Sequence, residues 1–158
     1  MKPEIRYATL KDAHYVAQNL KFEDRMELAG LGHTAFQVVL GYLFCEESFT
    51  FTDYNGELAG IGGVIPDQEG NAYIWVLCTP AITKMGLTFF RQAKAKIDEI
   101  TEGYNMVYAL CDSRNKLHHR FLKFLGFKAL RAIPQEPYYI PYYEVVKLCV
   151  SQQQQSLH

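Results

Sequence analysis

Two alternating apolar segments around Asn55-Gly56 constrain the fold more than any other part of the sequence. Residues 48–65 read SFTFTDYNGELAGIGGVI, so every second side chain of each arm falls on the same side of an extended chain. The Asn-Gly pair between the arms suits the positive φ angles of a type I′ turn. The segment therefore predicts an antiparallel β-hairpin.

The rest of the chain switches between the period of a strand and the period of a helix. Residues 72–79 (AYIWVLCT) are apolar on both faces, as expected of a central strand, and Thr9 and Asp12 have the spacing of a capping box. Further strands are expected at 4–8, 105–111, 127–133 and 142–150, and helices at 9–20, 33–45, 82–100 and 115–125. The order β-α-α-β-β-β-α-β-α-β-β predicts an α+β fold with one mixed sheet and helices on its faces.

Length and composition fit one globular domain. The chain has 158 residues, of which 49% are hydrophobic and 21% charged, which is enough apolar surface for a core. We expect a single domain over residues 1–150 and a flexible polar tail over residues 151–158 (SQQQQSLH). The N-terminus lacks the apolar region of a signal peptide, and no apolar run has the length of a membrane-spanning helix. These features predict a soluble, cytoplasmic protein.

Charge and cysteine usage argue against several classes of function. The net charge is −1, so nucleic acid is not an expected partner, although a local basic helix contains Lys116, Arg120, Lys123 and Lys128. No CxxC pair occurs, and each cysteine lies in an apolar run, namely Cys45, Cys78, Cys111 and Cys149. This usage favours buried, reduced thiols over disulfides, and no metal site is expected.

The stretch from Asn115 to Phe127 adds a pattern of greater specificity. Asn115 follows the strand at 105–111, and the next helix closes with RFLKFLGF, in which Gly126-Phe127 opens another strand. Together with the element order and the hairpin, this pattern resembles the GNAT N-acetyltransferase superfamily over about residues 4–150. The resemblance implies the GNAT fold, acetyl-CoA as cofactor, and acetyl transfer to an amine on a small molecule or a protein.

A narrower resemblance rests on shorter pieces. DRME (residues 24–27), AGIGGV (residues 59–64) and Trp75, taken with the pattern after Asn115, look like a bacteriophage branch of GNAT-like proteins. That branch includes small internal virion proteins of podophages. It implies, as the alternative to an enzyme, a catalytically inactive virion or assembly protein with other phage virion proteins as partners, located in the host cytoplasm or the virion.

The resemblance places the cofactor pyrophosphate where the central strand meets the following helix, at TPAITKMGLTFF (residues 79–90). A helix N-terminus offers unpaired amides to phosphates. Only Gly86 of the family's glycine pattern is present, and Pro80 removes an amide, so weak or absent acetyl-CoA binding is expected. A helix cap by Thr79 or Thr83 is the alternative use of those hydroxyls. The cofactor-binding candidates are Leu77, Thr79, Thr83, Lys84, Gly86 and Asn115.

Two carboxylates are the candidates for a general base that accepts the proton of the amine. Asp24 and Glu27 stand three residues apart in KFEDRMELA, and they share one face if this segment is helical. A structural ion pair with Arg25 is the alternative for either carboxylate.

The acid that protonates the departing thiolate is harder to find. The family often has a tyrosine in the last helix, and Leu122 stands in its place here. Four tyrosines near the end of the chain, Tyr138, Tyr139, Tyr142 and Tyr143, could take its place, and Tyr139 is the first candidate for the acid. His118 and His119 are expected to be exposed to solvent, and contact with a pantetheine arm or with another protein is the alternative. The sequence leaves open whether the chain is an enzyme.

Overall fold

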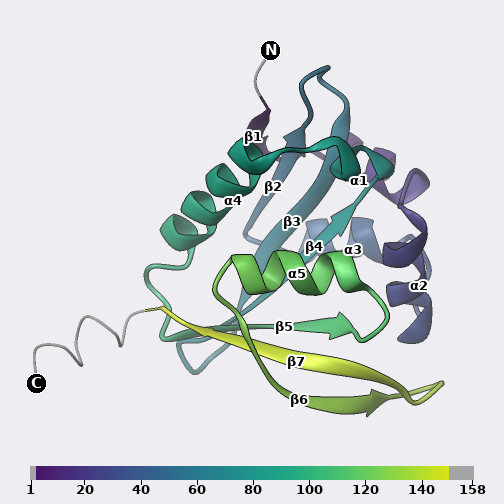
Figure 1. Cartoon of the computed structure of the whole chain (residues 1–158), viewed down its shortest axis with the longest axis vertical. Coiled ribbons are helices and arrows are strands. Elements are labelled where there is room, and N and C mark those ends of the chain that lie inside the picture. Colours follow the sequence, from purple (N-terminus) through teal and green to yellow (C-terminus); the bar gives the residue numbers. More distant parts are fainter. Residues whose placement is uncertain (1–2, 150–158) are drawn as a thin grey trace, which may run out of the picture.

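The computed structural model describes residues 3–149, which form a seven-stranded mixed sheet with helices on both faces (Figure 1). The strand order is β1-β2-β3-β4-β5-β7-β6, and only the β4–β5 pair is parallel. The strands are β1 (Glu4–Tyr7), β2 (Glu47–Thr52), β3 (Leu58–Pro66), β4 (Ala72–Cys78), β5 (Met106–Asp112), β6 (Lys128–Gln135) and β7 (Ile140–Leu148). The helices are α1 (Leu10–Gln18), α2 (Phe22–Gly30), α3 (Gln37–Phe44), the 3-10 helix η1 (Pro80–Lys84), α4 (Leu87–Ile100) and α5 (Lys116–Phe124).

This arrangement confirms the predicted α+β class and its single mixed sheet. The helix α2 forms over the segment whose helicity the sequence left conditional. Among residues 3–149, no helix is long and apolar enough to cross a membrane. The predicted polar tail at 151–158 lies outside the described residues.

The hairpin between β2 and β3 forms as predicted, but its turn is not of type I′. Gly56 has a positive φ angle of 78°, whereas Asn55 does not have the left-handed conformation that a type I′ turn requires. The Asp53 carboxylate accepts hydrogen bonds from the backbone N–H groups of Asn55 (2.8 Å) and Glu57 (2.9 Å). Because this side chain organises the loop, only Gly56 has to be left-handed.

The helix predicted over residues 82–100 is two helices. Thr79 caps η1, which has Pro80 in its first turn, and the chain is then extended at Gly86 (φ −100°, ψ −177°) before α4 begins. The predicted apolar face persists in α4, whose buried residues are Phe89, Ala93 and Ile97. The break gives α4 an N-terminus of its own, shortly after the end of β4.

The helix α1 begins with the predicted capping box. The Thr9 hydroxyl accepts a hydrogen bond from the Asp12 N–H (3.2 Å), and the Asp12 carboxylate accepts one from the Thr9 N–H (2.9 Å). The same carboxylate accepts two hydrogen bonds from Arg6 of β1, at 2.7 and 3.0 Å. These bonds fix α1 to the edge strand of the sheet.

Helices α1, α2 and α3 cover one face of the sheet, and α4 and α5 cover the other (Figure 1). The first face includes Val16, Leu28, Val38, Ile61 and Leu77, and the second includes Phe51, Cys78, Phe89, Leu122, Leu125 and Val145. A Cβ atom added to Gly63 would lie 2.7 Å from the Cys45 sulfur, so this glycine allows the end of α3 to approach β3 closely. All four cysteines are free thiols, as predicted, but only Cys78 and Cys111 are buried, whereas Cys45 and Cys149 are partly exposed.

The two parallel strands at the centre of the sheet separate along their length. Between β4 and β5, only Ala72 pairs with Val107 and Tyr73 with Tyr108. Beyond these pairs the strands diverge toward their carboxyl ends (Figure 1). The facing backbone amides of this split need partners from outside the two strands.

Candidate active site

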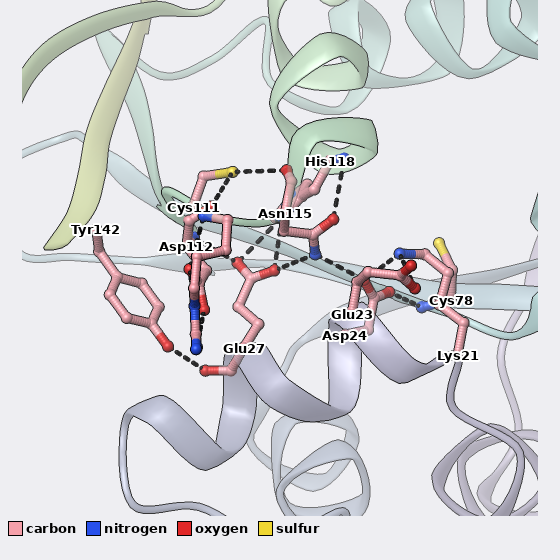
Figure 2. Close-up of polar contacts among 11 residues, drawn as sticks. Lys21, Glu23, Asp24, Glu27, Cys78, Cys111, Asp112, Asn115, His118 and Tyr142 are labelled. Carbon is pink, nitrogen blue, oxygen red and sulfur yellow. Dashed lines mark hydrogen bonds and ion pairs between the residues drawn. The ribbon is translucent and has the colours of Figure 1, made fainter. Parts of the chain in front are cut away.

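Helix α2 supplies two buried carboxylates to the split. Asp24 is 3% exposed and Glu27 is 6% exposed, so the predicted shared face of the helix is the face that packs on the sheet. Asp24 accepts a hydrogen bond from the Cys78 N–H at the end of β4 (2.6 Å). Glu27 accepts one from the Asp112 N–H at the end of β5 (3.2 Å). The two carboxylates thus satisfy one amide on each side of the split (Figure 2).

Asn115 joins the two carboxylates to α5. Its side-chain amide donates to Asp24 Oδ1 (2.9 Å) and to Glu27 Oε2 (2.6 Å), and its carbonyl oxygen accepts from the His118 N–H (3.3 Å). Asn115 is therefore the N-cap of α5 and the centre of a buried polar network (Figure 2). These bonds use the whole side-chain amide of Asn115. Asn115 therefore has a structural role and no free donor with which to bind a cofactor.

His118 is largely buried and His119 is partly buried, contrary to the expectation that both are exposed to solvent. The His118 side chain is 11% exposed, and its Nδ1 lies 3.0 Å from each carboxylate oxygen of Glu27. Burial disfavours the charged imidazolium, but the charge of Glu27 and hydrogen bonding to Cys111 and Glu27 outweigh it and raise the pKa of His118 well above its ordinary value. The sequence interpretation failed because only the position of α5 over the split decides which polar side chains of this helix are buried.

The tyrosine at the site is Tyr142, not Tyr139. Tyr139 lies in the turn between β6 and β7, where its side chain is 65% exposed and makes none of the contacts of the polar network within residues 3–149. Tyr142 is fully buried, and its hydroxyl donates to the Glu27 carbonyl oxygen. Burial, together with the charges of Asp112 and Glu27, raises the pKa of Tyr142, so this hydroxyl holds α2 in place and is a poor source of protons.

Lys21, which the sequence did not single out, contributes an ammonium group to the network. Its side chain is 7% exposed and its ammonium lies 2.8 Å from Asp24 Oδ1, whereas Arg25, the expected partner, is exposed. Burial lowers the pKa of Lys21, but the charge of Asp24 outweighs this effect and the pKa is raised. Asp24 is therefore held by an ion pair and by hydrogen bonds from two elements.

The predicted cofactor loop divides into buried and exposed residues. The Thr79 hydroxyl is buried, donates to the Leu58 carbonyl (2.7 Å) and caps η1, which confirms the helix-cap alternative for this residue. The Thr83 hydroxyl donates to the Pro80 carbonyl (2.7 Å) at the surface. Lys84 is exposed at the end of η1, and Gly86 is the N-cap of α4. A Cβ atom at Gly86 would meet only the Tyr54 hydroxyl, at 3.8 Å, so the approach to this helix N-terminus is open.

Two pockets meet at the network. The first, which we call the α4–α5 pocket, lies on the face covered by those helices and is lined by Lys21, Asp24, Val76, Cys78, Ile82, Phe90, Leu117, His118 and Phe121. The second, the α2 pocket, is lined by Glu27, Leu28, Leu31, Tyr73, Trp75, Leu77, Leu110 and His118, among others. His118 lines both pockets, so the Glu27–His118 pair lies between them. Leu77 therefore faces the α2 pocket rather than the α4–α5 pocket.

The α4–α5 pocket continues outward as an apolar groove between the two helices. The groove is lined by Leu87, Phe90, Leu117, Arg120, Phe121 and Phe124, and three of these residues also line the pocket. Leu87 is the first residue of α4, so the groove begins at that N-terminus. Leu122, one turn after His118, is 2% exposed and packs in the core against the sheet, away from the groove.

No protein-family model matches the sequence, and no curated protein matches it either. Solved structures match through their fold. An acetyltransferase (GNAT family) from Bacillus anthracis aligns with a TM-score of 0.68 and 17% identity, over 94% of this chain and 95% of that one. The spermidine N-acetyltransferase from Vibrio cholerae, in complex with CoA and spermine, aligns with a TM-score of 0.68 and 14% identity over 94% and 96%. The chain has the GNAT fold.

A third solved structure that matches the fold contains acetyl-CoA. The yncA protein from Salmonella typhimurium, with its cofactor acetyl-CoA, aligns with a TM-score of 0.66 and 14% identity over 94% of this chain and 95% of that one. The predicted fold class and superfamily resemblance are thus confirmed at the level of the fold.

One group of side chains within this GNAT fold has the ligand types of a metal site. The donor atoms of Glu27, Cys111 and His118 all lie within 4.8 Å of one another. Glu27 and His118 are already paired with each other, and the Cys111 thiol contacts the carbonyl oxygens of Asp112 and Asn115 at 3.6 and 3.8 Å. Protein partners alone therefore account for the arrangement of these three side chains.

Proposed function

We propose that this chain is an acetyl-CoA-dependent N-acetyltransferase that acts on an amine. The observation that carries the proposal is the position of the buried Glu27–His118 pair between two pockets on opposite faces of the split sheet. Acyl transfer needs an acyl donor and an acceptor that approach the same point from different directions. The spermidine N-acetyltransferase with the same fold is seen with both CoA and spermine, which supports this class of donor and acceptor.

The groove between α4 and α5 is the best place for acetyl-CoA. Its apolar walls suit an extended pantetheine arm, and the N-terminus of α4 offers amide donors and its dipole to a pyrophosphate. Arg120 lines this groove, and the exposed Lys84 precedes Leu87, where the groove begins, by three residues. The open approach at Gly86 fits a bound phosphate, whereas Thr79 is already used inside the protein. Acetyl-CoA supplies the thioester when bound.

In this proposal Glu27 and His118 divide the proton transfers. Glu27 accepts the proton that the amine loses when its nitrogen attacks the thioester carbon from the α2 pocket. His118 donates a proton to the sulfur as the carbon–sulfur bond breaks on the side of the α4–α5 pocket. Nδ1 of His118, which lies 3.0 Å from Glu27, keeps its proton, so solvent then takes the proton from Glu27 and returns one to the other ring nitrogen of His118. Asp24 and Asn115 position the pair rather than touch the substrate.

Isothermal titration of acetyl-CoA tests the proposal. We expect 1:1 binding with a micromolar dissociation constant, followed by acetyl transfer to at least one member of a panel of alkylamines, polyamines and peptides. An absence of heat at millimolar acetyl-CoA would contradict it. Wild-type activity in the Asp24→Asn and Glu27→Gln variants would refute the roles given to these carboxylates.

A second candidate is a catalytically inactive phage virion or assembly protein that keeps the fold for protein contacts. The observation that favours it is that Asp24 and Glu27 already occupy backbone donors at the ends of β4 and β5, where a ligand would otherwise bind. Leu122 in the core, in place of a tyrosine, also favours it. Failure to bind acetyl-CoA, together with gene neighbours that encode portal, tail or internal core proteins, would support this candidate and a location in the virion or host cytoplasm.

A further inference from the structure

Lys21 lines the α4–α5 pocket, and its buried ammonium has fewer hydrogen-bond partners than its three N–H donors allow. It lies 2.8 Å from Asp24 Oδ1 and 3.7 Å from Glu23, but among residues 3–149 it makes no hydrogen bond of good geometry. An ammonium carries three N–H donors. A buried donor without a full set of partners reduces stability, and the effect is larger when the donor is charged.

A further hydrogen-bond partner of the Lys21 ammonium can bind only from the side of the α4–α5 pocket. Asp24 already accepts hydrogen bonds from the Cys78 N–H and from the Asn115 side chain. The remaining walls of the pocket are mainly apolar, formed by Val76, Ile82, Phe90, Leu117 and Phe121. A ligand that enters this pocket and satisfies Lys21 must therefore present an oxygen that carries negative charge or a strong carbonyl dipole.

The position of Lys21 is fixed before any ligand binds. Its backbone N–H donates to the Cys78 carbonyl at the end of β4 (2.9 Å), and its side chain is held by the ion pair with Asp24. The Cys78 N–H, a backbone donor at the same strand end, is taken by Asp24. Because Asp24 occupies the Cys78 N–H, Lys21 is the preorganised hydrogen-bond donor at this strand end that can still bind a ligand. His118 lines the same pocket.

We propose that Lys21 is a catalytic residue that binds the thioester carbonyl oxygen in the α4–α5 pocket and stabilises the negative charge on it during attack by the amine. This inference rests on the proposed acetyl transfer. As the carbon–nitrogen bond forms, the carbonyl π electrons move onto oxygen next to the ammonium. As the carbonyl re-forms, the carbon–sulfur bond breaks and the sulfur takes its proton from His118. Lys21 keeps its protons throughout.

The first test is Lys21→Met, which keeps the length of the side chain and removes the charge. Loss of one donor to a developing oxyanion typically lowers kcat by about 10²–10³-fold, and we expect a loss of that size with a small change in KM for acetyl-CoA. Lys94→Met, on the exposed surface of α4, is the matched control and should keep the kcat of the wild type. Affinity for CoA, which has no thioester carbonyl, should be the same in wild type and Lys21→Met.

Lys21→Met also leaves Asp24 buried without its cation, so misfolding has to be separated from lost chemistry. The double variant Lys21→Met/Asp24→Asn removes both charges and is compared with Asp24→Asn alone, with thermal unfolding measured for each. We expect the Lys21 change to lower kcat in both backgrounds. A folded Lys21→Met protein whose kcat is within threefold of the wild type would overturn the role of Lys21 while leaving acetyl transfer intact. A wild type without acetyl-CoA binding or amine acetylation would overturn both proposals.

Discussion

Two networks in this molecule tie a helix to the sheet through a buried carboxylate, and they differ in what they leave unused. At the edge of the sheet, Asp12 accepts hydrogen bonds from Arg6 and from the Thr9 N–H. At the split in the centre, Asp24 and Glu27 accept from both diverging strands and from Asn115. Only the central network borders two pockets and holds a cation whose donors lack good partners.

The difference separates a structural network from a candidate functional one. Polar groups that serve only stability are expected to satisfy each other, because every unsatisfied buried donor reduces stability. The Asp12 network meets this expectation, since its carboxylate caps α1 and fixes it to β1. The central network does not meet it at Lys21, and strongly perturbed pKa values cluster around it, as at His118 and Tyr142.

The largest effect that would sharpen this comparison is expected from Glu27→Gln. If Glu27 is the base, loss of the carboxylate should lower the rate of acetyl transfer by about 10²–10⁴-fold, because general base catalysis contributes that much. Steady-state kinetics with the best amine of the panel measures it. The control is Glu99→Gln, at an exposed position of α4. If the rate of acetyl transfer in Glu27→Gln falls by less than tenfold, the central network has a structural role only, like the Asp12 network.

Asn115→Ala should give the next largest effect, on stability. The change removes the donor shared by Asp24 and Glu27 and leaves both buried carboxylates short of a partner. We expect a loss of about 2–4 kcal/mol in the free energy of unfolding, measured by urea denaturation. Asn19→Ala, at the exposed end of α1, should change it by less than about 0.5 kcal/mol. Equal effects at the two positions would show that the network adds little stability.

Asp12→Asn probes the satisfied network through its pH dependence. Burial raises the pKa of Asp12, but hydrogen bonds from Arg6 and Thr9 outweigh it, so the pKa is lowered. The stabilisation is therefore present above the ordinary pKa of about 3.9 and is lost as the pH falls through the lower pKa of the folded state. We expect Asp12→Asn to cost about 1–2 kcal/mol at neutral pH and progressively less below about pH 4. Thermal unfolding at several pH values measures this, and a difference that does not depend on pH would contradict it.

Lys84→Gln should have the smallest effect, because Lys84 is exposed and acts only through its charge. We expect acetyl-CoA affinity to fall by about two- to fivefold, and the difference to shrink at high salt. Titration at low and high ionic strength measures both. Lys128→Gln, on the edge strand β6, is the control, and an equal loss there would argue against a phosphate site at the N-terminus of α4.

Much of the fold could be predicted because the patterns that specify it are local. The alternating arms around Asn55-Gly56 and the capping box at Thr9 concern residues close in sequence, and both formed. The prediction was wrong where a nearby side chain changed the local geometry. The Asp53 carboxylate holds the hairpin loop in a conformation other than a type I′ turn. The extended backbone at Gly86 divides the helix expected over residues 82–100 into two helices.

The candidate site could be predicted only in part, since most of its contacts join distant segments. The sequence placed Asp24 and Glu27 on one face because their spacing fixes this once α2 is helical. It could not show that His118 meets Glu27 across 91 residues, or that Tyr142 rather than Tyr139 reaches α2. Lys21, Asp24 and Glu27 follow one another at intervals of three residues, and this spacing could have pointed to Lys21. A surface helix often has the same spacing of charges, so the signal is not specific.

The sequence by itself determined the order and type of the main elements, the face that Asp24 and Glu27 share in α2, and Asn115 as the start of α5. Periodicity and capping decide such features over a few residues. Only the tertiary structure decided that β4 and β5 part after Tyr73 and Tyr108, and that α2 and α5 meet at the opening. Lys21 is buried and His118 is largely buried near that opening, because exposure depends on what packs across a helix rather than on its own residues.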